Sequence, residues 1–439
     1  MTDPLIDLSG ASPLLIPPLP GERQHHRLSN GLRVALVHNP QAPVVTCALW
    51  YRAGTRDEGP QEGGAAHFLE HMMFKGSRRF GPGVVDRRTQ AHGGTNNAFT
   101  SHEATAYYFS FARDRWPLAL EIEADRMEAL TLDPDETASE RQVVLEEIAM
   151  YEGEPWDALE MKVQSELYGD HPYGKPVLGT RESLGTLGPE ELRAFHRRHY
   201  RPGNAVLVVA GDLEAGHRYA LERVEQTFGA IEAGAASAPF PQAAAPALGE
   251  WRRVERRRGE TARLILAARV PGVLEGGDVR PSYAALQLAS TVLSGGRASR
   301  LQRRLVDEGQ LCSWVSSHLT EGAETATFSV SLEVLPGVSP ARVEEELFAV
   351  LQELASGPPG ERELERARRV QLADWVFANE RIHQQAMTLG FDLILFQEDH
   401  GRRLTAASLA STPQALSAAM AEAVDPRSGG IIGWSLPES

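Results

Sequence analysis

The stretch GGAAHFLEHMMFKG, residues 63–76, combines apolar residues at helical spacing with two histidines and a glutamate. On a helix, His67 and His71 lie one turn apart on the same face, about 6 Å apart along the axis, so both imidazoles can bind one metal ion. Glu70 lies next to His71, close enough to act on a water molecule bound to that metal. The order of residues inverts the HExxH zinc motif but keeps its physical logic. The pattern therefore predicts a helix that carries two metal ligands and a base.

A third ligand decides between this prediction and a plainer one, a surface helix with two solvated histidines. A catalytic zinc ion needs three protein ligands and an open position for water. The stretch SERQVVLEEIAMYEG, residues 139–153, predicts a helix on which Glu140 and Glu147 lie two turns apart on one face. Such a pair can supply one carboxylate that binds the metal and one that holds the outer nitrogen of a histidine. Glu146 points elsewhere, because neighbouring helical positions are offset by about 100°.

The elements around these two helices indicate a mixed fold. The stretches GLRVALVHNP at 31–40 and VVTCALWYRAG at 44–54 are rich in β-branched residues and predict strands. The stretch 97–112 alternates as strands do, and residues 116–130 are amphipathic at the helical period. An Ala/Pro-rich segment follows further along the chain, and beyond it the order of strand, helix, strand and helix resumes. We therefore predict an α+β fold with two domains of similar size and element order.

The composition shifts place the domain boundaries. The first residues, with prolines at 13, 17, 18 and 20, predict an extended arm over 1–27. The metal-binding domain is expected over 28–232. The uncharged Ala/Pro-rich segment predicts a linker over 233–250, and the second, similar domain is expected over 251–439.

Length, charge and cysteine content exclude several classes of protein. The 439 residues are 42% hydrophobic and 23% charged, which suffices for large cores and excludes a disordered chain. A net charge of −15 argues against a nucleic-acid or anionic-membrane partner, because phosphate contacts need clustered cations. Cys47 and Cys312 lie too far apart in the chain to form a CxxC metal site, so zinc would need histidine and carboxylate ligands. We interpret them as two buried free thiols.

No apolar run approaches the ~20 residues that a membrane span needs, so we expect no membrane span. The first residues, MTDPLIDLSG, lack the basic and apolar regions of a secretory signal. The expected location is therefore cytoplasmic, or periplasmic if a signal peptide was removed.

Several spaced motifs together resemble the insulinase (pitrilysin, M16) family of zinc peptidases, and in particular its half-length, processing-peptidase-like branch. The family carries HxxEH and a glutamate about 76 residues after the second histidine, which is the spacing from His71 to Glu147. The likeness is strong over residues 28–213 and weaker beyond them. Its other motifs are YRAGTRDE, HMMFKGS, GGTNNAFTSHEATAYYF, HPYGKPVLG, YRPGN and, in the second half, VLSGGRASRLQRRL. The resemblance implies two mostly antiparallel sheets covered by helices, forming half of a clamshell.

The resemblance also implies roles for the candidate site residues. His67, His71 and Glu147 would bind zinc as the cofactor. Glu70 would be the catalytic base that takes a proton from the water that attacks the peptide carbonyl. Glu140 would orient the ligands from outside the metal's own coordination shell.

Substrate binding is implied at a strand that follows the metal helix. Asn97, Ala98 and Phe99 match the edge strand on which such enzymes bind an extended peptide through backbone hydrogen bonds. Such backbone pairing explains broad tolerance for the substrate's sequence. The alternative interpretation of Phe99 is a core aromatic residue.

The second half departs from the family at two positions. Complete sites carry an arginine and, seven residues later, a tyrosine, after a Gly-rich stretch that ends in SRL. Following SRL at residues 299–301, Val306 stands where the arginine is expected and Ser313 where the tyrosine is expected. Shifting the alignment by one residue would offer Trp314 but still no arginine. The alternative is a misalignment of this weakly similar region.

The missing pair predicts a partner chain. In the half-length branch, the zinc of one chain faces the arginine and tyrosine of another. We therefore expect a heterodimer with an M16-like chain that carries this pair and a degenerate HxxEH, while a homodimer stays possible. The predicted function is a zinc endopeptidase subunit acting on peptides or short unfolded polypeptides. The alternative is a non-catalytic peptide-binding or scaffold subunit of an M16-like complex, and a less favoured one is another metal hydrolase that shares HxxEH by coincidence.

Overall fold

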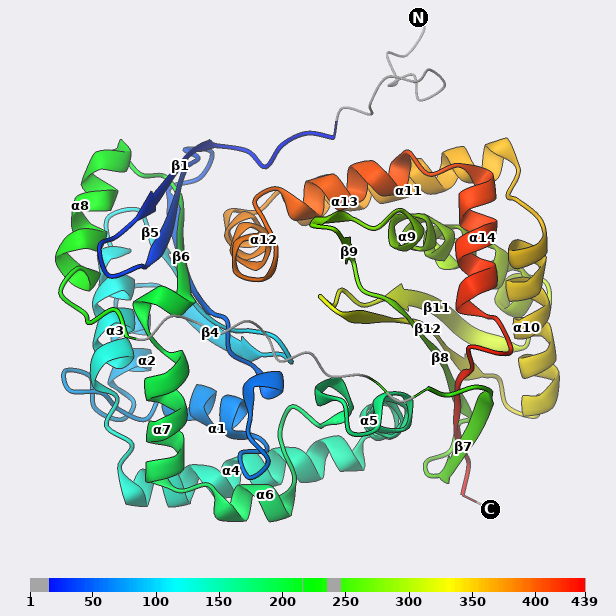
Figure 1. Cartoon of the computed structure of the whole chain (residues 1–439), viewed down its shortest axis with the longest axis horizontal. Helices are drawn as coiled ribbons and strands as arrows, with labels where there is room; N and C mark the ends of the chain where they lie inside the picture. The colour runs from blue at the N-terminus through cyan, green and yellow to red at the C-terminus, as the bar shows by residue number, and fades with distance from the viewer. Residues whose placement is uncertain (1–15, 215, 235–244, 246, 439) are drawn as a thin grey trace, which may run out of the picture.

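The computed structural model describes residues 16–438 except 215, 235–244 and 246. Its strands form two large sheets, one in each half of the molecule (Figure 1). The first sheet contains β1 (Glu22–Arg27), β2 (Arg33–His38), β3 (Val44–Tyr51), β4 (Thr95–Thr100), β5 (Thr105–Ala112) and β6 (Ala205–Gly211). The second contains β7 (Trp251–Arg257), β8 (Arg263–Pro271), β11 (Cys312–Leu319), β12 (Thr325–Val334) and β13 (Gly430–Leu436). A separate small pair is formed by β9 (Leu274–Glu275) and β10 (Asp278–Val279).

The two sheets share one topology. The first has the order β1-β2-β6-β3-β5-β4 and the second has the order β7-β13-β8-β12-β11. Without β1, the five strands of the first sheet correspond in order to the five strands of the second. In each set, the strand that comes first in the chain pairs in parallel with the one that comes last, β2 with β6 and β7 with β13. The remaining pairs are antiparallel. The predicted α+β fold of two similar, mostly antiparallel domains is therefore confirmed, with β1 as an additional strand of the first sheet.

Helices cover both faces of each sheet. One face of the first sheet packs against α1 (Ala65–Met72), α3 (Pro117–Ala129), α7 (Pro189–His199) and α8 (Gly216–Phe228). One face of the second packs against α9 (Pro281–Ser294), α10 (Pro340–Ser356), α11 (Glu361–Ala378), α13 (His400–Leu409) and α14 (Pro413–Ala423). The other α-helices are α2 (Val84–Ala91), α4 (Pro134–Gly153), α5 (Pro155–Tyr168), α6 (Arg181–Thr186) and α12 (Ile382–Leu395). Short turns of other helix types are η1 (Thr55–Asp57), η2 (Pro172–Gly174), η3 (Pro202–Asn204) and the π-helical η4 (Gln302–Asp307).

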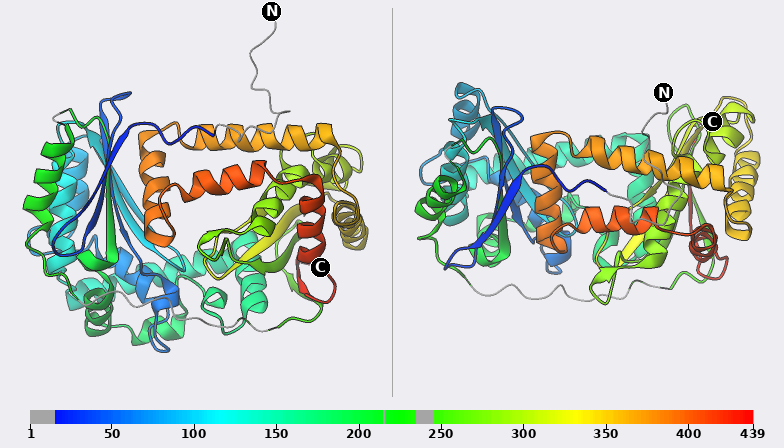
Figure 2. Two further views of the ribbon diagram at one scale, coloured as in Figure 1. Left: turned by 45° about the horizontal axis from the view of Figure 1, so that its top comes forward. Right: turned by 90° about the horizontal axis from the view of Figure 1, so that it is seen from above.

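The two halves exchange one helix each. The remaining face of the first sheet packs against α12, which comes from the second half of the chain (Figures 1 and 2). The corresponding face of the second sheet packs against α5, which comes from the first half. Each exchanged helix is the third helix after its own central hairpin, β4–β5 or β11–β12. The exchange therefore follows the same repeated order as the strands, and it ties the halves together.

Glycines allow both exchanged helices to approach the sheets closely. A Cβ atom on Gly390 of α12 would lie 2.0 Å from Nε1 of Trp50 on β3. A Cβ atom on Gly433 of β13 would lie 2.3 Å from a methyl group of Val163 on α5. Both distances are far shorter than real contacts, so a side chain there would push the helix off the sheet.

Part of the predicted arm is a strand. Residues 22–27 form β1, which pairs antiparallel with β2 at the edge of the first sheet. Its sequence, ERQHHR, carries no apolar alternation, because the strand buries no apolar face and is held by backbone pairing. Residues 22–27 of the predicted extended arm over 1–27 are therefore part of a folded element, the first sheet, whereas residues 1–15 lie outside the described residues. Most of the predicted linker over 233–250 also lies outside them, so the domain boundaries stay a prediction.

Two simpler predictions are confirmed. Cys47 and Cys312 are free and buried. Across the part of the chain that the structure describes, no helix is both long enough and apolar enough to cross a membrane.

We predict that Gly390→Ala lowers the free energy of unfolding by about 1–3 kcal/mol, because overpacking at Trp50 displaces α12 from the first sheet. Denaturant unfolding followed by circular dichroism measures it. The matched control is Gly185→Ala on α6, where an added Cβ meets no atom within 4 Å and alanine favours the helix. Equal stability of the two variants would show that α12 does not need this close approach.

Candidate metal centre

Helix α1 is anchored at its first turn and along its apolar face. The carboxylate of Glu58 accepts hydrogen bonds from the backbone N–H groups of Gly64 and Ala66, both at 3.0 Å. These are N–H groups that a helix start leaves unpaired, and a carboxylate there also matches the helix dipole. Phe68 and Leu69 are fully buried in the core of the first domain. With these residues fixed, the histidines of α1 emerge on the side that faces α4.

Helix α4 supplies the two carboxylates. Its start is capped by Asp133, whose side chain accepts from the backbone N–H groups of the following turn. Val144 and Ile148 are buried and hold the helix against the core. Glu140 and Glu147, two turns apart, lie toward α1. The structure therefore places the two glutamates on one face, as the seven-residue spacing predicted.

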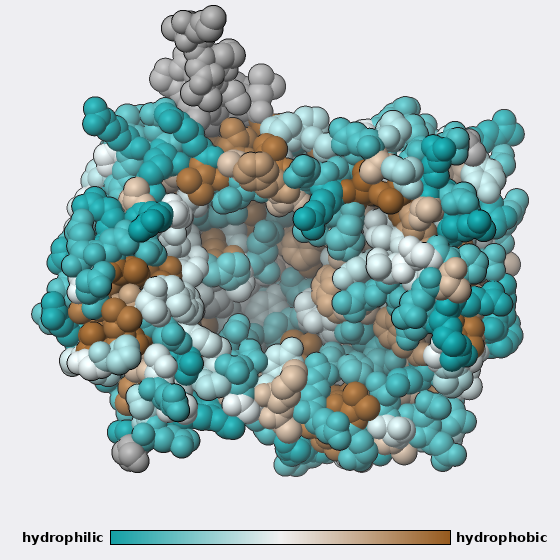
Figure 3. Space-filling view, turned by 180° about the vertical axis from the view of Figure 1, so that it is seen from behind, coloured by the Kyte–Doolittle hydropathy of each residue, from teal (hydrophilic) through white to brown (hydrophobic). Residues whose placement is uncertain are grey.

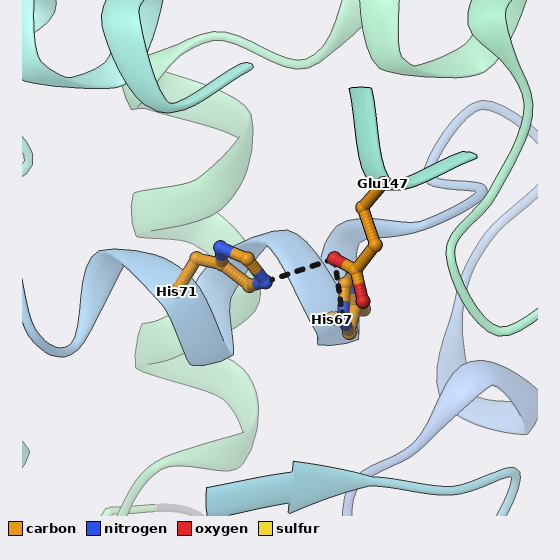
Figure 4. Close-up of side chains that lie close together, drawn as sticks. All are labelled: His67, His71 and Glu147. Carbon is orange, nitrogen blue, oxygen red and sulfur yellow. Dashed lines mark ion pairs between the residues drawn. The ribbon is translucent and has the colours of Figure 1, made fainter. Parts of the chain in front are cut away.

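Three ligand atoms converge between α1 and α4 (Figure 4). One carboxylate oxygen of Glu147 lies 3.7 Å from Nε2 of His67 and 3.4 Å from Nε2 of His71. The three side chains each offer a ligand atom within 4.8 Å of the others, and this is the single such set of three found among the described residues. The structure thus brings together the three residues predicted to bind a metal.

The two distances from Glu147 fit a tetrahedral zinc ion. Zinc bonds of 2.0–2.2 Å to nitrogen and oxygen place neighbouring ligand atoms about 3.3–3.6 Å apart. The two distances to Glu147 lie within about 0.1 Å of that range. Two neutral imidazoles and one carboxylate are also a donor set that zinc accepts in catalytic sites, with the fourth position left for water. The residues present therefore fit the metal.

The protonation of the two histidines differs. Burial and, to a smaller extent, the neighbouring His71 lower the pKa of His67 to about 4, although Glu147 opposes this shift. Burial also acts on His71, but hydrogen bonds to Glu140 and Glu147 outweigh it and raise its pKa to about 9. The carboxylate of Glu147 has a lowered pKa because it pairs with His71. A cation between these atoms would replace the proton that holds His71 and Glu147 together.

Glu140 holds His71 from behind. Its Oε1 lies 2.9 Å from Nδ1 of His71, and its Oε2 pairs with Nζ of Lys75 at 2.5 Å. A proton on Nδ1 shared with Glu140 leaves the lone pair of Nε2 directed at Glu147, which is the tautomer that can bind a metal. Burial opposes the charge on Glu140, but its bonds to His71 and Lys75 outweigh burial and lower its pKa.

Glu70 lies in a separate environment. Its Oε2 accepts a hydrogen bond of 2.6 Å from the hydroxyl of Thr100, the last residue of β4. Burial raises the pKa of Glu70, although the bond from Thr100 opposes that shift. A carboxylate whose pKa rises toward neutrality is better matched to taking and returning a proton near pH 7.

The predicted substrate strand lies at the open edge of the first sheet. Strand β4, which contains Asn97, Ala98 and Phe99, is the last strand in its sheet and pairs with β5 alone. The side chain of Asn97 accepts from the backbone N–H of Ala98. Phe99 is 37% exposed and makes an edge-to-face contact with Trp50, so it is not a core residue. The free edge is available to an added strand.

The second half holds no arginine–tyrosine pair at the expected positions. Val306 packs in part against the core of the second domain, and Ser313 is exposed at an irregularity of β11. Nearby arginines are engaged elsewhere, because Arg300 forms two hydrogen bonds of 2.8 Å with Glu363. Trp314 is 38% exposed and lies against Trp156 of α5.

A cavity lies between the two halves. Its volume is about 410 Å³, and its walls come from α5, β8, β11, β12 and the turn after β4. Figure 3 shows the molecule hollowed at its middle. Trp156 and Trp314 are among the aromatic residues that line it, so a chain that leaves the end of β4 meets an apolar surface.

Sequence reasoning missed three residues that hold the site. Glu58 caps α1, Thr100 orients Glu70, and Lys75 neutralises Glu140. All three lie inside motifs shared with the family, but only the fold shows what their side chains contact. Thr100 lies 30 residues from Glu70, and an ordinary threonine in a strand gives no signal of this role.

Comparison with known proteins finds two family models along the chain. Residues 33–181 match the family model described as insulinase (peptidase family M16), and residues 186–371 match that of the peptidase M16 inactive domain. An uncharacterized zinc protease of Mycobacterium leprae is 36% identical over 313 residues, which cover 71% of this chain and 68% of the relative. The uncharacterized zinc protease YmxG of Bacillus subtilis is 33% identical over 67% of this chain and 70% of its own.

Solved structures share the fold. A protease from Helicobacter pylori superposes with a TM-score of 0.87 at 24% identity, over 95% of this chain and all of that one. The periplasmic protease PqqL from Escherichia coli superposes with a TM-score of 0.75 at 19% identity, over 96% of this chain but 48% of PqqL. With two consecutive family models matched and relatives similar over two thirds of their length, the chain belongs to the insulinase family of peptidases, peptidase family M16.

Proposed function

We propose that this chain is the metal-binding subunit of a zinc endopeptidase that hydrolyses peptides or short unfolded polypeptides. The observation that carries the proposal is the convergence of His67 and His71 from α1 with Glu147 from α4, with Glu70 next to His71 on α1. The relatives from Mycobacterium leprae and Bacillus subtilis are named zinc proteases, which supports zinc as the metal.

The residues divide the reaction between them. Zinc, when bound, supplies Lewis-acid activation of water and of the peptide carbonyl. Glu70 is the base that accepts the proton of the attacking water at a carboxylate oxygen and then passes it to the leaving amine. Thr100 orients the carboxylate of Glu70, because its hydroxyl donates a hydrogen bond to one of the two carboxylate oxygens. Glu140 keeps His71 in the tautomer that can bind the metal.

The substrate adds as a strand to β4. The free edge of β4 offers backbone N–H and C=O groups, which an extended peptide of almost any sequence can pair with. Thr100 ends this strand and contacts Glu70, so a peptide on β4 passes beside the base. The cavity beyond the strand is lined by residues of both halves and accommodates a further part of the chain. A folded protein cannot present such a strand, which restricts the substrates to peptides and unfolded segments.

A partner chain completes the site. Val306 has no side-chain donor for the carbonyl oxygen, and the hydroxyl of Ser313 is too short to reach it as the phenol of a tyrosine would. The donors that stabilise the developing oxyanion must therefore come from another M16-like chain, so we propose a heterodimer. The fold of half of PqqL is compatible with two such chains facing each other.

Glu70→Gln is expected to keep the metal and lose hydrolysis. The amide preserves the shape and the bond to Thr100 but cannot accept a proton, so we predict a fall in kcat of roughly 10²–10⁴-fold. Metal content by mass spectrometry and turnover of a fluorogenic peptide measure the two effects. The control is Glu146→Gln on the exposed side of α4, which should change neither. Full activity of Glu70→Gln would assign the base to another residue.

Glu140→Gln is expected to weaken zinc binding about 10- to 100-fold, because the amide orients His71 less strongly and leaves the charge of Lys75 uncompensated. Competition with a chelator of known affinity measures the dissociation constant. Glu70→Gln serves as the reference, since it alters a neighbouring carboxylate that is not bonded to a ligand. Equal zinc affinities for the two variants would contradict the proposed role of Glu140.

The purified chain alone is expected to be nearly inactive, since losing oxyanion donors costs about 10²–10³-fold in rate. Mixing it with an M16-like chain that carries the arginine and tyrosine but no HxxEH should restore hydrolysis. The measurement is peptide turnover against the molar ratio of the two chains, with Glu70→Gln of this chain as the blank. Strong activity without a partner would rule out the requirement.

A further inference from the structure

Two equivalent turns of the two sheets meet beside the site. The first turn, residues 101–104, joins β4 to β5, and the second turn, residues 320–324, joins β11 to β12. These hairpins occupy the same place in the two sheets. The backbone N–H of Ala323 in the second turn lies 3.4 Å from a carboxylate oxygen of Glu103 in the first. The contact between halves at this point is therefore direct.

Arg56 bridges the two turns. Its Nη1 donates to Glu103 and its Nη2 to Glu324, both at 2.7 Å. The side chain of Arg56 is 2% exposed. The hydroxyl of Tyr173 also donates to Glu103, and Arg56 donates to that hydroxyl at 3.3 Å. A buried guanidinium with two carboxylates is a charge-assisted arrangement with fixed geometry.

The segment that carries Arg56 also holds both supports of Glu70. The backbone N–H groups of Thr55 and Arg56 donate to the carbonyl oxygens of Ser101 and His102 in the first turn, at 3.3 and 3.0 Å. Two residues further on, Glu58 caps the start of α1. Residues 55–58 thus contact the second half through Arg56 and the start of α1, the helix of Glu70, through Glu58. They also contact the first turn, which directly follows Thr100, the hydrogen-bond donor to Glu70.

We propose that Arg56 and Glu324 are positioning residues for Glu70, so that the second half of the chain sets the placement of the base in the first half. This inference rests on the proposed function for the identity of the base. Glu324 holds Arg56, Arg56 holds the first turn, and the first turn fixes the end of β4, where Thr100 bonds to Glu70. The exchanged helices α5 and α12 join the halves by packing against the sheets, whereas this bridge joins them through ion pairs at the turn that follows Thr100.

The test uses Glu324→Ala, which removes one partner of Arg56 and leaves Glu103 to pair its charge, so the fold is retained. Arg56 itself is a poorer target, because its loss leaves the buried carboxylate of Glu103 without its counter-charge. Glu324→Gln is the conservative variant, since its amide oxygen can still accept from Arg56. The matched control is Glu321→Ala in the same turn, because the carboxylate of Glu321 contacts His400 instead.

Hydrogen–deuterium exchange of the full chain gives a readout that needs no activity. In Glu324→Ala, amides of residues 52–58 and 98–106 should exchange roughly 3- to 30-fold faster, the range expected for residues that couple distant sites. Residues 22–38 should be unchanged, and Glu321→Ala should match the wild type in all three segments. Unchanged exchange at 98–106, or equal acceleration everywhere, overturns the proposal.

Kinetics of the active assembly give the second readout. Glu324→Ala should lower kcat by a similar factor with KM unchanged, because the substrate strand remains while the base is displaced, and Glu324→Gln should fall between it and the wild type. A rise in KM with kcat unchanged overturns the proposal, since it indicates a role in substrate binding. If the wild-type assembly shows no hydrolysis, the proposed function fails, and the exchange experiment still decides whether Glu324 fixes the first turn.

Discussion

The site depends on one geometric constraint: a single carboxylate oxygen of Glu147 must lie between two imidazoles that belong to another helix. Helix α1 spans only eight residues, too few to be stable on its own, so its direction must be imposed from outside. Glu58 fixes its first turn, the core fixes its apolar face, and Glu140 fixes His71. The charge of the buried Glu140 carboxylate is balanced by Lys75 and His71, and this pairing offsets the free energy lost when the carboxylate is removed from water. Each support comes from a different part of the chain, and together they leave α1 one position.

The sequence predicted the arrangement of the candidate site where functional residues lie at regular spacings on one helix. The HxxEH spacing and the seven-residue spacing from Glu140 to Glu147 follow the geometry of a helix, so they predicted which side chains would share a face. The resemblance to the family then distinguished Glu147 as the expected ligand from Glu140. The polar strand β1 escaped notice because its pairing depends on backbone groups that every residue carries. The bond from Thr100 to Glu70 and the bridge from Arg56 to Glu324 join residues 30 and 268 positions apart. No local pattern announces such contacts, because they exist only once the sheets are placed.

The shared topology shows where the two halves differ: in the segment between two equivalent strands, which contains the proposed metal-binding helix in the first half only. In the first sheet, the chain between β3 and β4 forms η1, α1 and α2, and α1 bears two of the three proposed metal ligands, His67 and His71. At the same place in the second sheet, the chain forms β9, β10, α9 and η4. The two sheets share their strand order but differ in this connecting segment. One sheet can therefore carry the proposed metal site, while strands of the other line the cavity. The low similarity of the two halves in sequence conceals this relation, whereas the strand order displays it.

The exchange of α5 and α12 has a consequence for how the molecule holds together. Separating the halves would remove α12 from the first sheet and α5 from the second. Trp50 and its neighbours on one sheet, and Ile265 and its neighbours on the other, would then form two wide apolar faces exposed to water. Neither half therefore constitutes an autonomous folding unit, although each has its own core. The chain should melt in a single cooperative transition despite its two domains, and a duplicated ancestor of one half would have needed a second copy of itself to cover its bare face.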